Sequence, residues 1–237
     1  MKAKNSEFID MSYDKNQKLK PGLYAITPDN VSIKEVYRMV NLACQAGLPV
    51  LQWRRKDTRF EDALNQIPKI QDICDKYGTQ LIINDDWQLA IEVGADGVHL
   101  GKDDGDVVEI SNILRQKAPK DFMIGMSCYN DLSLLNIALE AKVDYIAFGA
   151  LFPSRTKPQA VHANLDLFSQ ARRFYETHNV PCPSLVGIGG IDVNNAASVV
   201  KAGADNIAVI SALFHTKQIS ARTKEFQQIF KELTHDN

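Results

Sequence analysis

The sequence predicts a single (β/α)8 barrel, because short apolar segments alternate with longer amphipathic ones from residue 22 onward. The apolar segments have the length of strands and lie at residues 23–27, 49–53, 80–84, 97–100, 122–127, 144–149, 184–189 and 206–210. Strand–helix alternation indicates a parallel sheet, since every parallel connection needs a crossover. Eight such units in 237 residues favour a closed barrel, which typically needs about 250 residues, over an open sheet.

The segments between the strands have the apolar periodicity of helices, as in IKEVYRMVNLACQAG after the first strand. A helix followed by Gly-Ala-Asp and a strand recurs at 92–100 and 201–210. This repeat predicts that Gly94 and Gly203 end helices, where a left-handed residue is common. Residues 22–237 thus form the predicted barrel domain.

The first 21 residues are polar and lack the apolar segment of a secretory signal, so residues 1–21 are predicted to be an N-terminal extension. The net charge of −2 gives no general attraction to nucleic acid or to an anionic membrane surface. No apolar run approaches the roughly 18 residues of a membrane span. We therefore expect neither nucleic acid nor membrane as a partner.

Four cysteines are spread along the chain and form no closely spaced pair: Cys44, Cys74, Cys128 and Cys182. Isolated cysteines in apolar or amphipathic segments are typical of buried reduced thiols. The sequence therefore predicts a cytoplasmic protein without a disulfide framework or a zinc site. It leaves open whether the protein is a monomer or a homo-oligomer.

Hydrogen-bonding groups or glycines follow seven of the eight predicted strands. They are Gln52, Arg54 and Lys56; Asn84, Asp85 and Asp86; His99, Lys102, Asp103 and Asp104; Ser127; Ser154, Thr156 and Lys157; Gly189 and Gly190; and Ile210 and Ser211. Active sites of (β/α)8 barrels lie at the carboxyl ends of the strands. A single charged strand end is more often solvated than catalytic, but this concentration predicts one site at the barrel mouth.

The charged members of this set suit a metal-bound diphosphate. Arg54, Lys56 and Lys157 are cations that can hold phosphate oxygens. Asp85 and Asp104 follow neighbouring strands, and Mg²⁺ commonly takes one or two carboxylates together with water and substrate phosphate. Helix capping is the structural alternative: Asp85 or Asp86 for the helix that starts near residue 87, and Asp104 for the next one.

The last two strands predict a second phosphate site. Gly189 and Gly190 allow close approach of a ligand to the backbone, and Ile210 and Ser211 follow the eighth strand. Barrels often bind phosphate there through backbone N–H groups. The sequence therefore predicts two phosphorylated groups in one mouth.

The strand-two segment LPVLQWRRK illustrates how alternation sorts these residues. Gln52, Arg54 and Lys56 share one face, whereas Trp53 and Arg55 share the other. We expect the first three to emerge into the mouth and Trp53 to pack on the opposite side.

From residue 22 to about 214 the chain resembles the thiamine phosphate synthase family. The resemblance depends on QWRRK, LIINDD, GADGVHLGKDD, IGMS, DYIAFGALFPSRTK, GIGGI and VIS, in this order and at the strand ends. It implies a (β/α)8 barrel that joins 4-amino-2-methyl-5-hydroxymethylpyrimidine diphosphate to thiazole phosphate with Mg²⁺. Diphosphate would leave first, and the thiazole nitrogen would capture the resulting pyrimidine methylene cation.

The resemblance also implies roles for individual residues. Contacts to the pyrimidine diphosphate would come from Gln52, Arg54, Lys56, Asn84, Ser127 and Lys157, of which Lys157, Arg54 and Ser127 would be catalytic. Mg²⁺ would be held by Asp85 and Asp104. The thiazole phosphate would be held by Ser154, Thr156, Gly190, Ile210 and Ser211.

Three positions depart from the family pattern. Asp86 stands where Arg is frequent, Lys102 where Gln is usual, and Ser154 where the first Thr of the motif is expected. Ser154 keeps a hydroxyl group, so this change is mild. Asp86 and Lys102 indicate either a compensating exchange of charge or a change in activity.

Two other functions are alternatives to the synthase. A related barrel, the thiazole tautomerase, binds thiazole phosphate but does not need the complete set of diphosphate and metal residues. A non-catalytic protein that senses thiazole phosphate or thiamine phosphate is the other. His99 is a candidate acid–base residue, but its place within a strand predicts a packed histidine.

Overall fold

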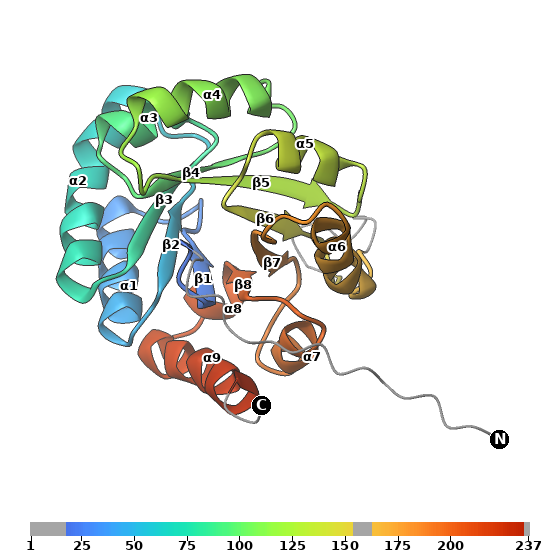
Figure 1. Ribbon diagram of the computed structural model, residues 1–237. Helices are drawn as coiled ribbons and strands as arrows, with labels where there is room; N and C mark the ends of the chain where they lie inside the picture. The colour runs from blue at the N-terminus through green and yellow to red at the C-terminus, as the bar shows by residue number, and fades with distance from the viewer. Residues whose placement is uncertain (1–17, 154–162, 235–237) are drawn as a thin grey trace.

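The computed structural model describes residues 18–153 and 163–234 and shows eight parallel strands closed into a barrel (Figure 1). The strands are β1 (Gly22–Ile26), β2 (Val50–Trp53), β3 (Gln80–Asn84), β4 (Gly97–Leu100), β5 (Met123–Tyr129), β6 (Tyr145–Phe148), β7 (Ser184–Ile188) and β8 (Asn206–Val209). Each pairs with its neighbours in chain order, and β1 closes the barrel against β8. The predicted (β/α)8 barrel is therefore confirmed, and the strand bounds agree to within two residues.

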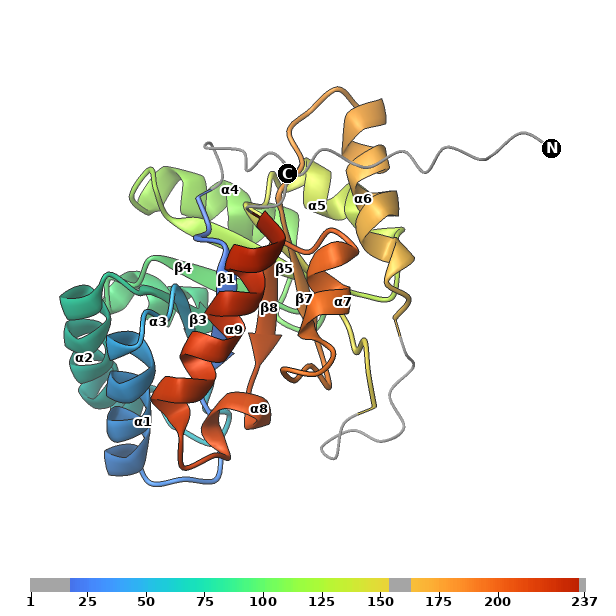
Figure 2. The same ribbon diagram turned by 90° about the horizontal axis from the view of Figure 1, so that it is seen from below.

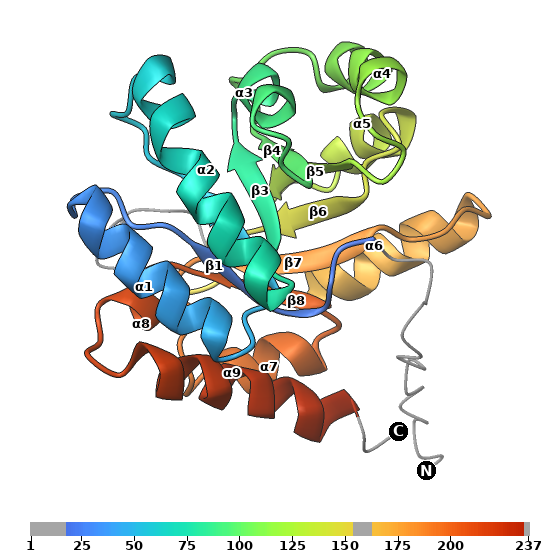
Figure 3. The same ribbon diagram turned by 90° about the vertical axis from the view of Figure 1, so that its left-hand side faces the viewer.

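Within the described ranges nine helices follow the strands, against the eight or so that the sequence predicts. They are α1 (Ile33–Gln45), α2 (Phe60–Tyr77), α3 (Trp87–Glu92), α4 (Val107–Lys117), α5 (Leu134–Glu140), α6 (Asp166–Thr177), α7 (Ala196–Lys201), α8 (Ser211–Phe214) and α9 (Ile219–Thr234). The additional helix is α8, a short turn at the carboxyl end of β8 (Figure 2). On the outside of the barrel α1 lies between α2 and α9 (Figure 3).

The strands separate two apolar layers, because successive side chains point to opposite faces. Inside the barrel lies a cluster with Tyr24, Val50, Ile82 and Tyr145 among its members. A larger cluster fills the space between the strands and the helices. The apolar stripe of α1 belongs to this outer layer, as its periodicity predicts.

The repeated Gly-Ala-Asp turns close the amino-terminal face of the barrel. Gly94 and Gly203 follow α3 and α7 with φ of +67° and +109°, so both end helices in the left-handed region, as predicted. Asp96 and Asp205 then precede β4 and β8, and Asp144 precedes β6. Each carboxylate accepts the backbone N–H of the second residue of the preceding strand at 2.6–2.8 Å. These bonds fix the starts of β3, β5 and β7. Because all eight strands are parallel, their carboxyl ends lie together at the opposite face.

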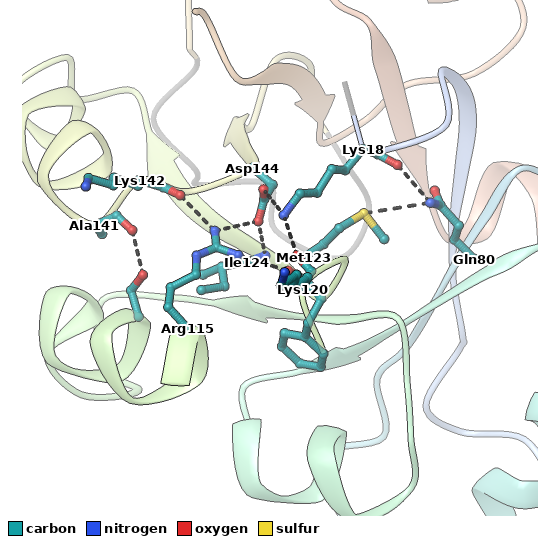
Figure 4. Close-up of polar contacts among 11 residues, drawn as sticks. Lys18, Gln80, Arg115, Lys120, Met123, Ile124, Ala141, Lys142 and Asp144 are labelled. Atoms are coloured by element: carbon teal, nitrogen blue, oxygen red, sulfur yellow. Dashed lines mark hydrogen bonds and ion pairs between the residues drawn. The ribbon is translucent and has the colours of Figure 1, made fainter. Parts of the chain in front are cut away.

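Residues 18–20, which the sequence places in the polar extension, cross this amino-terminal face. Leu19 is fully buried inside the barrel. The Lys18 carbonyl oxygen accepts a hydrogen bond from Gln80 Nε2 at 2.8 Å, and its ammonium group lies 3.1 Å from Asp144 (Figure 4). Asp144 also pairs with Arg115 at 2.8 Å. Residues 18 and 19 therefore cover part of the amino-terminal end of the barrel interior.

No helix in the two described ranges is long and apolar enough to cross a lipid bilayer.

Candidate active site

The end of β2 sorts its side chains as the alternation predicts. Gln52 is buried inside the barrel, and Arg54 follows it on the same side. Trp53 is 3% exposed and packs in the outer layer, which confirms its predicted position. Arg55 lies on the Trp53 side, with its guanidinium 5.9 Å from the indole centroid and donating to the carbonyl oxygen of Val31 at 3.1 Å.

The loop after β1 holds the end of β2 in place. The Thr27 hydroxyl accepts the Arg54 N–H at 2.8 Å and donates to the Arg54 carbonyl oxygen at 3.0 Å. Asp29 Oδ2 accepts from the Arg54 guanidinium at 2.6 Å, and Asp29 Oδ1 accepts the Lys56 N–H at 3.3 Å. Sequence reasoning missed both residues, although they follow the first strand as polar residues follow the others.

The two predicted metal ligands do not cap helices. Asp86 caps α3 and Asp106 caps α4, each through its carboxylate. Asp104 instead accepts the Gly101 N–H at 2.6 Å, which closes the turn that follows β4. Asp85 has a φ of +67°, a left-handed conformation that Asp tolerates better than most residues. This turn separates the Asp85 carboxylate from the helix that Asp86 caps.

Asp85 and Asp104 form a carboxylate pair whose side chains are within hydrogen-bond distance. Burial, followed by the charge of Asp104 and the hydrogen bond to it, raises the pKa of Asp85 to about 6, although Lys56 and Arg54 oppose the shift. A divalent cation would relieve the repulsion between the two carboxylates. Carboxylate oxygens are also the protein ligands that Mg²⁺ commonly takes. The described residues offer no third His, Cys, Asp or Glu, so such an ion would complete its shell with water and phosphate oxygens. The pair fits Mg²⁺ on these grounds.

A cavity of about 190 Å³ is lined by Asp85, one of the two carboxylates of the pair. It brings together Lys56, Asn84 and Asp85, three of the predicted ligand contacts, from β2 and β3. The rest of its lining comes from the outer side of β2 and β3, from the loops that follow them, and from α2 and α3: Trp53, Arg55, Thr58, Phe60, Ala63, Ile83, Asp86 and Leu89.

Five polar side chains cross the inside of the barrel as a row of hydrogen bonds, which we call the interior chain. Gln52 Nε2 donates to the Tyr24 hydroxyl at 2.9 Å, and the hydroxyls of Tyr24 and Tyr145 are 3.0 Å apart. His99 Nδ1 lies 3.2 Å from the Tyr145 hydroxyl, and His99 Nε2 lies 2.9 Å from Ser127 Oγ. The row thus joins two predicted substrate contacts, Gln52 and Ser127, through three residues.

His99 is packed, as its place within a strand predicts. Its ring stacks on that of Tyr145 with a centroid distance of 5.5 Å and an interplanar angle of 22°. Burial lowers the pKa of His99 to about 4, partly opposed by the charge of Asp104, so the ring is neutral at pH 7. Sequence reasoning missed Tyr24 and Tyr145, because each sits in a segment that also reads as apolar core.

The loops after β7 and β8 form the other side of the mouth. Gly190 has a φ of +68°, and a methyl group there would lie 2.5 Å from the Phe152 carbonyl oxygen and 2.7 Å from that of Pro153. Only glycine therefore fits this close crossing of two chain segments. Ile210 precedes α8, and Ser211 is exposed in its first turn, where backbone N–H groups lack helical partners.

The three remaining predicted contacts, Ser154, Thr156 and Lys157, lie outside the described residues. The described residues before them, Phe152 and Pro153, lie against the loop after β7. The Phe152 N–H donates to the Gly189 carbonyl oxygen at 3.0 Å, and the carbonyl oxygens of Phe152 and Pro153 lie close to Gly190.

The closed parallel barrel and a mouth with cations, a carboxylate pair and exposed backbone N–H groups define a (β/α)8-barrel enzyme for anionic, phosphate-bearing ligands. The sequence pattern of the thiamine monophosphate synthase family matches residues 23–213. The chain belongs to this family.

Curated relatives agree over nearly their whole length. The thiamine-phosphate synthase of Methylobacillus flagellatus is 44% identical over 209 residues, which cover 88% of this chain and 95% of the relative. That of Bordetella avium is 43% identical over 200 residues, covering 84% and 90%.

Solved structures agree with the fold. The thiamine phosphate pyrophosphorylase from Pyrococcus furiosus superposes with a TM-score of 0.74 at 27% identity, covering 92% of this chain and 99% of that one. A 3-hexulose-6-phosphate synthase from Salmonella typhimurium has a TM-score of 0.61 at 19% identity, covering 89% and 99%, and shares the fold alone.

Proposed function

We propose that the protein is a thiamine-phosphate synthase that joins 4-amino-2-methyl-5-hydroxymethylpyrimidine diphosphate to thiazole phosphate and releases diphosphate. Membership of the family supports this proposal. The observation that carries it further is the grouping of Arg54 and Lys56 with the carboxylate pair of Asp85 and Asp104. A tautomerase or a sensor of thiazole phosphate would have no use for this diphosphate and metal set.

The diphosphate end of the pyrimidine substrate is assigned to the strand-two and strand-three side of the mouth. Arg54 and Lys56 would bind its phosphate oxygens together with Asn84 and Lys157. Asp85 and Asp104 would hold Mg²⁺, which when bound supplies positive charge to the leaving diphosphate. The pairing of Arg54 with Asp29 would keep the guanidinium oriented before the substrate arrives.

The thiazole phosphate is assigned to the opposite side. Gly190, Ile210 and Ser211 would present backbone N–H groups to the phosphate, with Ser154 and Thr156 adding hydroxyl groups. Two substrates held at opposite sides of one mouth meet over the barrel axis. This arrangement supplies proximity and orientation without a protein nucleophile.

In the reaction, the bond between the pyrimidine methylene carbon and the diphosphate oxygen breaks, and the electron pair leaves with diphosphate. The thiazole nitrogen then forms the new bond to the methylene carbon. The groups that favour this order are those that stabilise negative charge on the leaving group, namely Arg54, Lys157 and the Ser127 hydroxyl.

We also assign the protein to the cytoplasm. Among the described residues the four cysteines are free thiols, three of them buried, which suits a reducing compartment.

The decisive experiment mixes both substrates with Mg²⁺ and measures thiamine phosphate and diphosphate together. The expected result is their formation in equal amounts, with neither product when one substrate is omitted. Binding of thiazole phosphate without turnover would favour the sensor instead. Isomerisation of thiazole phosphate in the absence of the pyrimidine would favour the tautomerase.

A further inference from the structure

Each hydrogen bond of the interior chain has one donor and one acceptor, and these can be assigned in order from Gln52 to Ser127. Gln52 presents its amide nitrogen, which can only donate, so the Tyr24 oxygen is an acceptor. Tyr24 is fully enclosed, and the other partner of its hydroxyl is Tyr145, so its own proton goes to the Tyr145 oxygen. The Tyr145 proton then goes to His99 Nδ1. A neutral His99 therefore carries its proton on Nε2 and donates it to Ser127 Oγ.

A cationic His99 does not satisfy the same contacts. Both ring nitrogens would then donate, and Tyr145 would have to turn its proton toward Tyr24. Tyr24 would accept from Gln52 and Tyr145 together, and its own buried O–H would have no acceptor in the interior chain. A buried donor without a partner is unfavourable, because it loses the hydrogen bond that water would otherwise accept from it. With Gln52 Nε2 facing the Tyr24 hydroxyl, the geometry therefore selects the neutral ring with Nδ1 as acceptor.

The packing around Tyr145 keeps these partners in place. The Tyr145 ring lies against Gly125, and a methyl group at that position would overlap it. The same ring stacks on His99 and meets Tyr24 edge to face, with centroids 5.9 Å apart. The rings of Tyr24, Tyr145 and His99 are therefore held by shape as well as by hydrogen bonds.

We propose that the interior chain makes Ser127 a hydrogen-bond donor toward the barrel mouth, with Tyr24, Tyr145 and His99 as its positioning residues. The His99 N–H occupies one lone pair of Ser127 Oγ, so the serine proton is free for an oxygen atom of the ligand. Ser127 is partly exposed, whereas Tyr24 and Tyr145 are buried. If the ligand is the diphosphate of the proposed synthase reaction, on which this last step depends, the proton reaches the oxygen that gains negative charge.

The first test measures the tautomer of His99 and does not depend on the reaction. Nitrogen-15 NMR of the wild-type protein at pH 7, with His99 assigned by comparison with His99→Gln, should show the proton on Nε2. A proton on Nδ1 would mean that the hydrogen bonds of the interior chain have the opposite direction, with the Ser127 hydroxyl donating to His99 Nε2. That result would overturn the proposal. A cationic ring would equally overturn the proposal.

The second test is a double-mutant cycle between Tyr145→Phe and Ser127→Ala with both substrates and Mg²⁺. Loss of the serine alignment should lower kcat about tenfold in Tyr145→Phe. In the Ser127→Ala background the same change should cost less than about twofold, because the group being positioned is gone. An equal loss in both backgrounds would show that Tyr145 acts only through the fold and would overturn the proposal.

Tyr175→Phe is the matched control for this cycle. Tyr175 is also a buried tyrosine, at 3% exposure, but its hydroxyl has no hydrogen-bond partner in the described part of the chain. This variant should keep the wild-type kcat. If the wild-type protein makes no thiamine phosphate, the proposed function fails, while the NMR measurement still decides the direction of the interior chain.

Discussion

Asp29 holds the guanidinium group of Arg54 at 2.6 Å, from a loop that lies one strand away in the barrel. The two side chains are 32% and 24% exposed, so the pair is only partly screened by water. Asp29 also accepts the backbone N–H of Lys56. One carboxylate therefore orients two cationic residues that we assign to the diphosphate.

Replacing Asp29 tests this orientation. In Asp29→Asn the charge and one of the two acceptor oxygens are lost, and we expect the KM for the pyrimidine diphosphate to rise about fivefold, the equivalent of about 1 kcal/mol. The KM for thiazole phosphate should not change. Asp62→Asn is the control, because Asp62 pairs with Arg59 on the exposed surface of α2. Equal rises for both substrates would contradict a role confined to Arg54 and Lys56.

Removing one carboxylate charge tests the metal site. Asp104→Asn keeps an acceptor for the Gly101 N–H but leaves one charged oxygen donor group in the pair. We expect the Mg²⁺ concentration for half-maximal activity to rise at least about tenfold, with thiazole phosphate affinity unchanged. Asp106→Asn, two residues along, should leave the Mg²⁺ dependence unaltered, because Asn also caps helices well. An unchanged Mg²⁺ dependence in Asp104→Asn would remove Asp104 from the metal site.

The carboxylate pair should also lower stability in the absence of metal. The pKa of Asp85 is raised to about 6 in the folded state, against 3.8 for an unperturbed Asp, so the folded state binds the proton more tightly. Stability therefore falls as pH rises from about 4 to 6. Asp85→Asn, which tolerates the same left-handed backbone, should gain about 1–2 kcal/mol at pH 7, after allowance for partial exposure.

Urea unfolding of wild type and Asp85→Asn at pH 4 and pH 7, without Mg²⁺, measures this difference. The gain should be present at pH 7 and nearly absent at pH 4, where Asp85 is protonated in the folded state. Asp86→Asn is the control, because it preserves the cap of α3. A gain of equal size at both pH values would mean that charge repulsion is not its cause.

Much of the fold could be predicted because each strand leaves a local signal. Apolar segments of four to six residues separated by amphipathic ones suffice to locate β1 to β8. The short α8 was not predicted, since four residues are too few to show a helical period. The Gly-Ala-Asp repeat indicated the helix ends at Gly94 and Gly203. It did not indicate that Asp96 and Asp205 bond a neighbouring strand, because that contact depends on sheet register.

Those parts of the site that depend on local sequence could also be predicted. Alternation along β2 placed Gln52 and Arg54 on one face and Trp53 on the other, since the period of a strand is local. The interior chain could not be predicted, because it joins residues of five strands and depends on how the closed barrel aligns them. Tyr24 and Tyr145 are core residues, as the sequence indicates. What the sequence does not indicate is that their hydroxyl groups form hydrogen bonds with each other, with Gln52 and with His99.

Gly125 offers a test of how the barrel interior supports the site. An alanine methyl group would overlap the Tyr145 ring, so Gly125→Ala should displace that ring and cost about 1–3 kcal/mol through overpacking. If the interior chain positions Ser127, kcat should fall in the same variant. The control is Gly78→Ala at the end of α2, where the added methyl meets no atom within 4 Å but the φ of +69° is unfavourable. Urea unfolding and steady-state kinetics should show both variants losing stability and only Gly125→Ala losing kcat. A Gly125→Ala protein with full activity would show that the orientation of Tyr145 does not matter for turnover.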